Sequence, residues 1–217
     1  MPAYAPTLEF PLRGAWAVVR SPGHHRHAYD FAAVRGPAFE YFRRPLLSLL
    51  WSGASVEDSH SWAQPVHAPL DATVVELCDD RPDSSTVRAV GHRVRLLSTR
   101  PRPRDVRALA GNFLMLRSQR WFILLAHLKR GSIRVGVGHS IEKGQLLAEV
   151  GNSGSSLAPH LHLQVLDAPD PQRAATIGFL VNEYDRWTGR QWQPARYREL
   201  VKGERVRFQC NESSSQG

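Results

Sequence analysis

The sequence predicts an all-β fold, an antiparallel β-sandwich or open barrel of short strands with long loops flanking a groove. Glycine (16) and proline (15) interrupt the 217 residues at short intervals, which favours short strands and turns over long helices. The segments between them alternate apolar and polar residues or form brief apolar runs, and both patterns are typical of strands. No apolar run reaches about 18 residues, so no transmembrane helix is expected.

Length and composition favour one domain, which we expect over residues 16–210. Residues 1–15 form a lead-in, and the composition of residues 211–217 predicts a disordered tail. Residues 36–62 and 79–110 lack clean periodicity, and long excursions of this kind commonly form the walls of a cleft. We therefore expect both segments to flank the groove.

The strand candidates combine β-branched, aromatic or aliphatic residues with a turn that contains Gly, Pro or Ser. A strand is expected to begin near residue 28, and residues 65–77 read as a strand–turn–strand pair. The remaining candidates are residues 16–20, 94–97, 113–117, 121–128, 145–150, 160–165, 179–182 and 206–208, with helical turns near 46–51 and 172–175.

The chain is strongly basic, with 28 Lys+Arg against 20 Asp+Glu, a net charge of +8 and a pI of about 10.2. This balance favours an anionic partner such as nucleic acid, an anionic membrane or an acidic polymer. Eight arginines fall within residues 81–107 beside two acids, so this stretch is either a solvated loop or a site for an anionic polymer. It lacks the interleaved aromatic residues of a nucleic-acid stacking platform, which disfavours nucleic acid.

The cysteines and the N-terminus bear on the cellular compartment of the protein. Cys78 and Cys210 lie far apart and show no CxxC spacing, so free thiols are expected rather than a disulfide scaffold or a metal site. The N-terminus lacks a basic start followed by an apolar run, and no signal peptide is expected. The redox state of the cysteines and the compartment stay open.

The most informative stretch is residues 151–165, GNSGSSLAPHLHLQV. On a strand, His160 and His162 share one face and the leucines share the other, which suits a core. Neighbouring imidazoles need polar partners if buried, and a metal ion would supply one. The alternative is a pair of surface histidines.

A second cluster, HHRHAYD at residues 24–30, has three histidines and an aspartate, which is a metal-ligand composition. Its alternative is a polar turn leading into a strand. Asp30 stands between core-type residues, so we expect it to be exposed or to have a specific partner. His127, near the end of the apolar run 121–128, is either functional or a core histidine with a backbone partner.

These segments together resemble the lysostaphin-like, LytM-type zinc endopeptidases of bacterial cell walls, which have a duplicated-hybrid-motif β fold. The likeness runs from about residue 16 to residue 182, with the three histidine-bearing segments in the family's order. It implies one Zn²⁺ per chain, held by one early histidine, Asp30 and His162. It also implies that His127 and His160 are catalytic histidines that do not bind the metal, that the substrate is peptidoglycan peptide, and that the protein works at the cell envelope.

One departure concerns the first ligand. The common family pattern places a histidine four residues before the aspartate, where this chain has Arg26. A branch of the family places that histidine further upstream of an AYDF-like strand, and residues 28–31 read AYDF. His24 is therefore our first choice, His25 the alternative and His27 the last; if none reaches the metal, the protein is an inactive member.

The resemblance implies hydrolysis of a peptide bond by attack of a zinc-bound water. No HExxH motif is present, so His127 and His160 would serve as general base and oxyanion stabiliser, with the assignment between them open. One alternative is an inactive LytM-like module that binds cell wall or regulates a partner hydrolase. Another is a lipoyl- or biotinyl-type carrier domain, suggested by the strand rhythm of residues 141–154, but it leaves the histidines unexplained. The peptide bond cleaved, the oligomeric state and the purpose of the arginine-rich loop stay open.

Overall fold

The computed structural model describes residues 5–19, 24–44, 54–87 and 106–208. Outside these ranges lie the expected strand 94–97, the expected helical turn 46–51, the tail 211–217, Cys210 and most of the arginine-rich stretch. Within them the all-β prediction is confirmed, because helical structure there consists of η1 (Val56–Asp58) and α3 (Val106–Ala110). No helix of the described residues is long and apolar enough to cross a bilayer.

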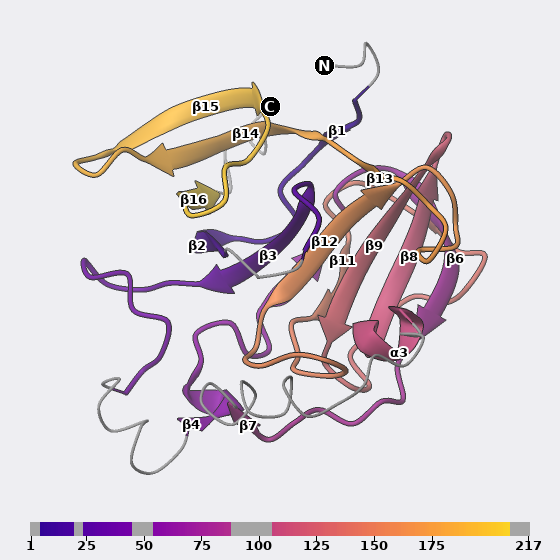
Figure 1. Ribbon diagram of the computed structural model, residues 1–217, viewed down its shortest axis with the longest axis horizontal. Coiled ribbons are helices and arrows are strands. Elements are labelled where there is room, and N and C mark those ends of the chain that lie inside the picture. Colours follow the sequence, from indigo (N-terminus) through magenta and orange to yellow (C-terminus); the bar gives the residue numbers. More distant parts are fainter. Residues whose placement is uncertain (1–4, 20–23, 45–53, 88–105, 209–217) are drawn as a thin grey trace, which may run out of the picture.

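One large, open sheet dominates the structure (Figure 1). Its strands run in the order β1-β14-β16-β2-β3-β12-β9-β8-β6-β10, with β13 added to β12 and β15 added to β14. Neighbours are antiparallel except for β1 and β14, and two small sheets, β5–β11 and β4–β7, complete the described fold. The bounds are β1 (Thr7–Leu8), β2 (Gly14–Val19), β3 (Ala28–Ala33), β4 (Ala54–Ser55), β5 (Pro65–His67), β6 (Ala72–Cys78), β7 (Thr86–Val87), β8 (Asn112–Ser118), β9 (Trp121–Leu128), β10 (Ser140–Ile141), β11 (Leu146–Glu149), β12 (Leu161–Leu166), β13 (Thr176–Ile177), β14 (Leu180–Trp187), β15 (Trp192–Arg198) and β16 (Arg205–Phe208).

The central strands follow the sequence pattern closely. The apolar run Trp121–Leu128 is strand β9 at the bounds expected for it, and β12 alternates as predicted, with Leu161 and Leu163 in the core. Towards the C-terminus the structure differs from the expectation. A long hairpin, β14 and β15, replaces the single short strand expected at 179–182, and a turn replaces the helical turn expected at 172–175.

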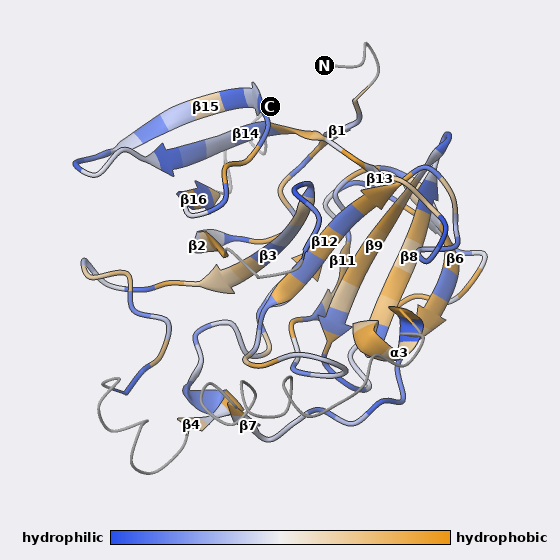
Figure 2. Ribbon diagram, viewed as in Figure 1, coloured by the Kyte–Doolittle hydropathy of each residue, from blue (hydrophilic) through white to orange (hydrophobic). Residues whose placement is uncertain are grey.

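The described residues form two apolar clusters, and the larger one joins the central strands to both ends of the described chain. The smaller cluster includes Phe113 and Leu124 and lies on the opposite face of β8 and β9. Apolar residues concentrate on β8, β9 and β12, whereas β15 is mainly hydrophilic (Figure 2). Residues 1–15, which the sequence suggests are a lead-in, belong to the core from residue 5 onward. Strand β1 pairs with β14, and Leu8, Phe10 and Leu12 are at most 1% exposed. Their burial removes apolar surface from water and fastens this segment to the sheet.

The register of the middle strands sets up the site. Strand β3 lies between β2 and β12, and its Asp30 pairs directly with His162 of β12. On its other edge β12 pairs with β9, where Ala126 is opposite His162. The end of β9, which carries His127, is thereby brought beside the His160–His162 stretch.

A close backbone approach explains the first glycine of the GNSG turn. The amide of Gly151 donates to the carbonyl oxygen of His127 at 3.0 Å. A Cβ at residue 151 would lie 2.3 Å from the backbone nitrogen of Lys129, closer than any side chain can approach. Only glycine permits this contact between the turn and β9.

Gly151→Ala should therefore lower the free energy of unfolding by about 1–3 kcal/mol, because the added methyl group forces two backbone segments apart. Urea denaturation of both proteins measures the change. Gly136→Ala is the matched control, because its Cβ would meet only the His139 side chain at 3.3 Å. Equal stability of the Gly151 variant and the wild type would contradict this account of the turn.

Candidate metal centre

Asp30 and His162 form the centre of a cluster of polar side chains buried in an apolar sheet. Asp30 is 3% exposed although Tyr29 and Phe31, its neighbours on β3, belong to the core. Nδ1 of His162 lies 2.8 Å from Oδ1 of Asp30, across the strand pair that places the two residues opposite each other. The carboxylate thus has the specific partner that the sequence pattern requires.

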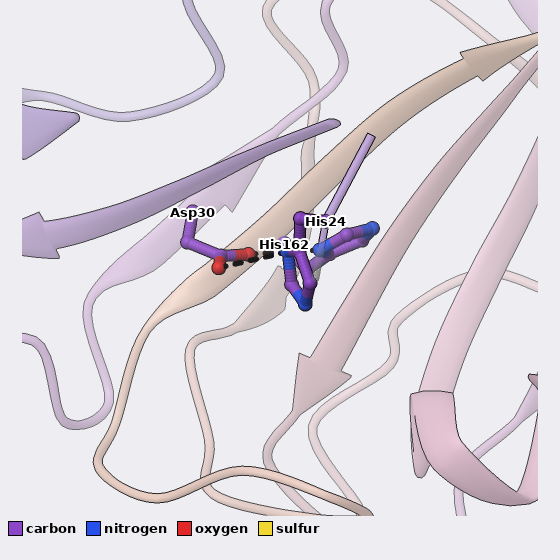
Figure 3. Close-up of side chains that lie close together, drawn as sticks. All are labelled: His24, Asp30 and His162. Atoms are coloured by element: carbon purple, nitrogen blue, oxygen red, sulfur yellow. Dashed lines mark hydrogen bonds and ion pairs between the residues drawn. The ribbon is translucent and has the colours of Figure 1, made fainter. Parts of the chain in front are cut away.

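His24 completes a group of three. Its Nδ1 lies 3.1 Å from Oδ2 of Asp30, and its ring centroid is 5.2 Å from that of His162. One ligand atom from each of the three residues lies within 4.8 Å of the other two. Figure 3 shows the carboxylate of Asp30 facing both imidazoles, with His24 approaching from the segment before β3.

The protonation of Asp30 reflects its surroundings. Burial alone raises the pKa of this carboxyl, but hydrogen bonds from His162 and His24 and the nearby His160 outweigh burial and hold the pKa below its usual range. Asp30 is therefore an anion at neutral pH, and a buried anion needs donors or a cation beside it.

The second nitrogen of His162 also faces an acceptor. Its Nε2 lies 3.2 Å from Oε1 of Gln164, whose amide nitrogen donates to Oγ1 of Thr176 at 2.5 Å. A neutral imidazole carries one N–H, so it cannot donate to Asp30 and Gln164 together. Either a second proton on the ring or a metal cation at Nδ1 resolves the conflict. With a metal there, Nε2–H donates to Gln164, as the second nitrogen of metal-binding histidines commonly does.

His160 precedes β12 and shares the polar face with His162. Its Nδ1 lies 2.8 Å from the carbonyl oxygen of Ala158, which accepts the Nδ1 proton and leaves Nε2 unprotonated. That Nε2 is 3.6 Å from Oδ1 of Asp30. Burial lowers the pKa of His160 although Asp30 opposes the shift, so the ring is neutral at neutral pH.

His127 reaches the cluster through an irregularity in β9. The pairing of β8 with β9 shifts register at Asn112, and His127 is the extra residue of this bulge, with a φ of 61°. Bulges and left-handed backbone at non-glycine residues re-aim side chains and are frequent at functional sites. The ring of His127 lies 4.6 Å from that of His160 and 6.0 Å from that of His162, measured between centroids.

Ser153 of the GNSG turn fixes the orientation of His127. Its carbonyl oxygen lies 3.0 Å from Nδ1 of His127, which leaves Nε2 free of a proton. The Ser153 hydroxyl donates to the carbonyl of Leu128 and accepts from the amide of Asn112, so the turn is bonded to β9 and β8 together. Burial lowers the pKa of His127 well below its usual value, and His160 and His162 lower it further.

The other two histidines of the early cluster have different surroundings. His25 is exposed; its Nδ1 accepts from the amide of His27 at 3.3 Å, and the two rings are 5.5 Å apart. Nδ1 of His27 lies 2.5 Å from a carboxylate oxygen of Glu199, away from Asp30. Among the described residues, His24 is the histidine of this cluster that is grouped with Asp30 and His162.

The structure thus brings together His24, Asp30, His127, His160 and His162, the five residues singled out from the sequence. Sequence reasoning missed Gln164 and Ser153. Gln164 stands two residues after His162, and that period-two spacing on a strand is the signal that could have identified it. For Ser153 no signal beyond the glycine-rich turn exists, because its contact with His127 is made by the backbone carbonyl, which every residue has.

The donor set suits a divalent metal. Two imidazole nitrogens and one carboxylate oxygen are ligands that zinc takes, and three protein ligands leave a further position open, as in catalytic rather than structural sites. The buried anion of Asp30 and the two acceptors around His162 fit a cation here. The fold and this cluster together define the class, an all-β protein with a candidate site for a divalent metal ion.

Comparison with known families identifies the chain. Residues 53–174, more than half of its length, match the model of Peptidase family M23. The protein belongs to this peptidase family. The match includes His127, His160 and His162 but begins after His24 and Asp30. No curated protein matches the chain.

Several solved structures are similar to this one. Among them are a protein from Pseudomonas aeruginosa assigned to peptidase M23 (17% identity over 76% of this chain and 46% of that chain, TM-score 0.42), the catalytic domain of the antimicrobial peptidase lysostaphin from Staphylococcus simulans (16%, 78% and 87%, 0.40) and a zinc-containing peptidase from Vibrio cholerae (18%, 80% and 37%, 0.38). The chain spans less than half the length of the first and the third.

Ser153→Ala should lower the free energy of unfolding by about 1–3 kcal/mol, because it leaves the buried amide of Asn112 without its acceptor. Chemical denaturation gives the value, and Ser140→Ala on the exposed start of β10 is the control. A Ser153 variant as stable as the Ser140 variant would show that the hydroxyl does not anchor the turn.

Proposed function

We propose that this M23 family member is a zinc-dependent endopeptidase that hydrolyses peptide bonds, with bacterial peptidoglycan as its substrate. The observation that carries the proposal is the convergence of His24, Asp30 and His162 on one point. Two further histidines stand beside this point with their Nε2 atoms unprotonated. Family membership supports the reaction class, and the resemblance to cell-wall endopeptidases supports the substrate.

In this proposal His24, Asp30 and His162 hold one Zn²⁺ per chain. Bound there, zinc polarises the scissile carbonyl and lowers the pKa of a water ligand, so that hydrolysis proceeds near neutral pH. Asp30 supplies the negative charge of the site. Gln164 and Thr176 orient the His162 ring through the hydrogen-bond chain from Nε2.

His127 and His160 handle protons in this proposal. Each has Nδ1 engaged by a backbone carbonyl, so each presents a basic Nε2. A neutral imidazole with a free Nε2 can take a proton from the attacking water and deliver it to the leaving amine. Once protonated, the same ring stabilises a developing oxyanion. The pair of rings thus provides both roles without a helix-borne glutamate.

The basic character of the chain supports an anionic, extended substrate such as cell-wall polymer. Within the described residues, Arg107 is engaged with Glu76, at 2.5 and 3.0 Å. The rest of the arginine-rich stretch lies almost wholly outside the described ranges. We propose that this stretch contacts anionic polymer, as its composition predicts.

A second candidate is an inactive module that binds cell wall or regulates a partner hydrolase. One observation favours it: the family match begins after His24 and Asp30, so two of the three proposed ligands lie outside the matched region. Zinc content separates the two candidates, because the inactive module does not need the metal.

Zinc should be close to stoichiometric in the wild type and lost in His162→Ala together with peptidoglycan turnover. His160→Ala should keep zinc and lose about 10²–10⁴-fold in turnover, because it removes a proton-transfer group and no ligand. Elemental analysis and release of dye from labelled peptidoglycan give the two readouts.

The control for both variants is His139→Ala, which removes an exposed histidine. Equal zinc loss in the His160 and His162 variants would overturn the division between catalytic and ligand histidines. A wild type that takes up no zinc when supplied with it would leave the inactive module as the function.

Gln164→Leu should weaken zinc binding by about 10–100-fold, because His162 then lacks the acceptor for its Nε2 proton. Gln164→Glu keeps an acceptor at the same distance along the side chain and should keep most of the affinity. Competition with a chelating dye measures both, and Gln193→Leu on exposed β15 is the control. Affinity unchanged in Gln164→Leu would rule out this orienting role.

A further inference from the structure

The C-terminal part of the chain contacts the segment that carries His24. Residues 199–202 follow β15 and lie against residues 25–29 at three points. Both segments are outside the region that matches the family model. The contacts join residues that are far apart in the sequence; Tyr29 and Leu200 are separated by 171 positions.

His27 provides the first contact. Its Nε2 accepts from Nε of Arg26 at 2.7 Å, so its proton is on Nδ1. That Nδ1 lies 2.5 Å from Oε1 of Glu199, and the His27 side chain is 12% exposed against 31% for Glu199. This contact does not have hydrogen-bond geometry, so the attraction between the imidazole and the carboxylate is electrostatic, and it is stronger where water is partly excluded.

Tyr29 and Lys202 provide the other two contacts. The buried hydroxyl of Tyr29 donates to the carbonyl of Leu200 at 3.2 Å and lies 3.3 Å from Glu199. Burial, and then Glu199, raise the pKa of Tyr29, which keeps the hydroxyl a donor. Nζ of Lys202 donates to the carbonyl of His25 at 2.9 Å.

The segment has little support of its own. Within it, one backbone hydrogen bond closes a turn from Ala28 to His25, and strand pairing begins only at Ala28. His24 is 35% exposed at its side chain and precedes that turn. A ligand on such a segment loses conformational entropy when it binds a metal, unless other contacts already hold it in place.

We propose that Glu199, Leu200 and Lys202 form a clasp, acting on residues 25–29, that positions His24 as the first metal ligand. This inference rests on the proposed zinc site. It explains how a histidine six positions before Asp30 reaches the same point as His162. The segment forms a turn between His25 and Ala28, and residues 199–202 hold this turn against the sheet. Glu199 and Lys202 are positioning residues that touch no metal.

The test compares zinc affinity and the Co²⁺ absorption spectrum of the full chain in Glu199→Ala, Glu199→Gln and Lys202→Met. Loss of the clasp should weaken Zn²⁺ binding by about 10-fold, as for other residues that orient ligands. It should also change the Co²⁺ d–d bands, because His24 no longer ligates in its place. Glu199→Gln retains the acceptor for the Tyr29 hydroxyl but removes the charge beside His27, so it should restore part of the affinity.

Glu183→Ala is the matched control, because it removes a glutamate of the preceding β14–β15 hairpin, where Glu183 pairs with exposed Arg196. Circular dichroism monitors folding, and Lys202→Met carries the test if Glu199→Ala unfolds. Wild-type zinc binding with unchanged affinity and spectrum in the Glu199→Ala and Lys202→Met variants overturns the clasp and leaves the proposed function intact. A wild type that binds no zinc overturns the proposed function and the clasp with it.

Discussion

A carboxylate buried in the middle of a sheet is the constraint around which this structure is arranged. Removing an ionised group from water is costly unless donors or a cation surround it. Asp30 meets that requirement through His162, which the strand register places directly opposite, and through His24 from the segment before the strand. Strand pairing rather than a loop fixes these two central residues, and sites built on strands are positioned more precisely than sites built on loops.

The strands at the centre of the sheet could be predicted because their burial repeats every second residue or is continuous. β9 and the alternation of β12 follow from this pattern. The pattern fails for β15, where a single residue, Ala195, is buried and the rest are partly or fully exposed. A strand without an apolar face gives no periodic signal, and only its pairing with β14 defines it.

The candidate site could be predicted as a set of residues but not as a geometry. His160 and His162 share a face because strand side chains alternate, and this needs no tertiary information. The pairing of His162 with Asp30, 132 positions away, depends on sheet order, which local sequence does not encode. The bulge at His127 could not be predicted from the sequence either, because the register shift depends on how β8 pairs with β9.

The turn between His24 and Asp30 has a consequence for how such sites are recognised in genomes. If His24 is the first ligand, a motif search that requires a histidine four residues before the aspartate passes over this chain, which has Arg26 there. The pairing of the aspartate-bearing strand with the His-x-His strand is insensitive to insertions between that histidine and the aspartate. Searches built on strand pairing would recover chains in which the first ligand has moved along the sequence while its position in space is kept.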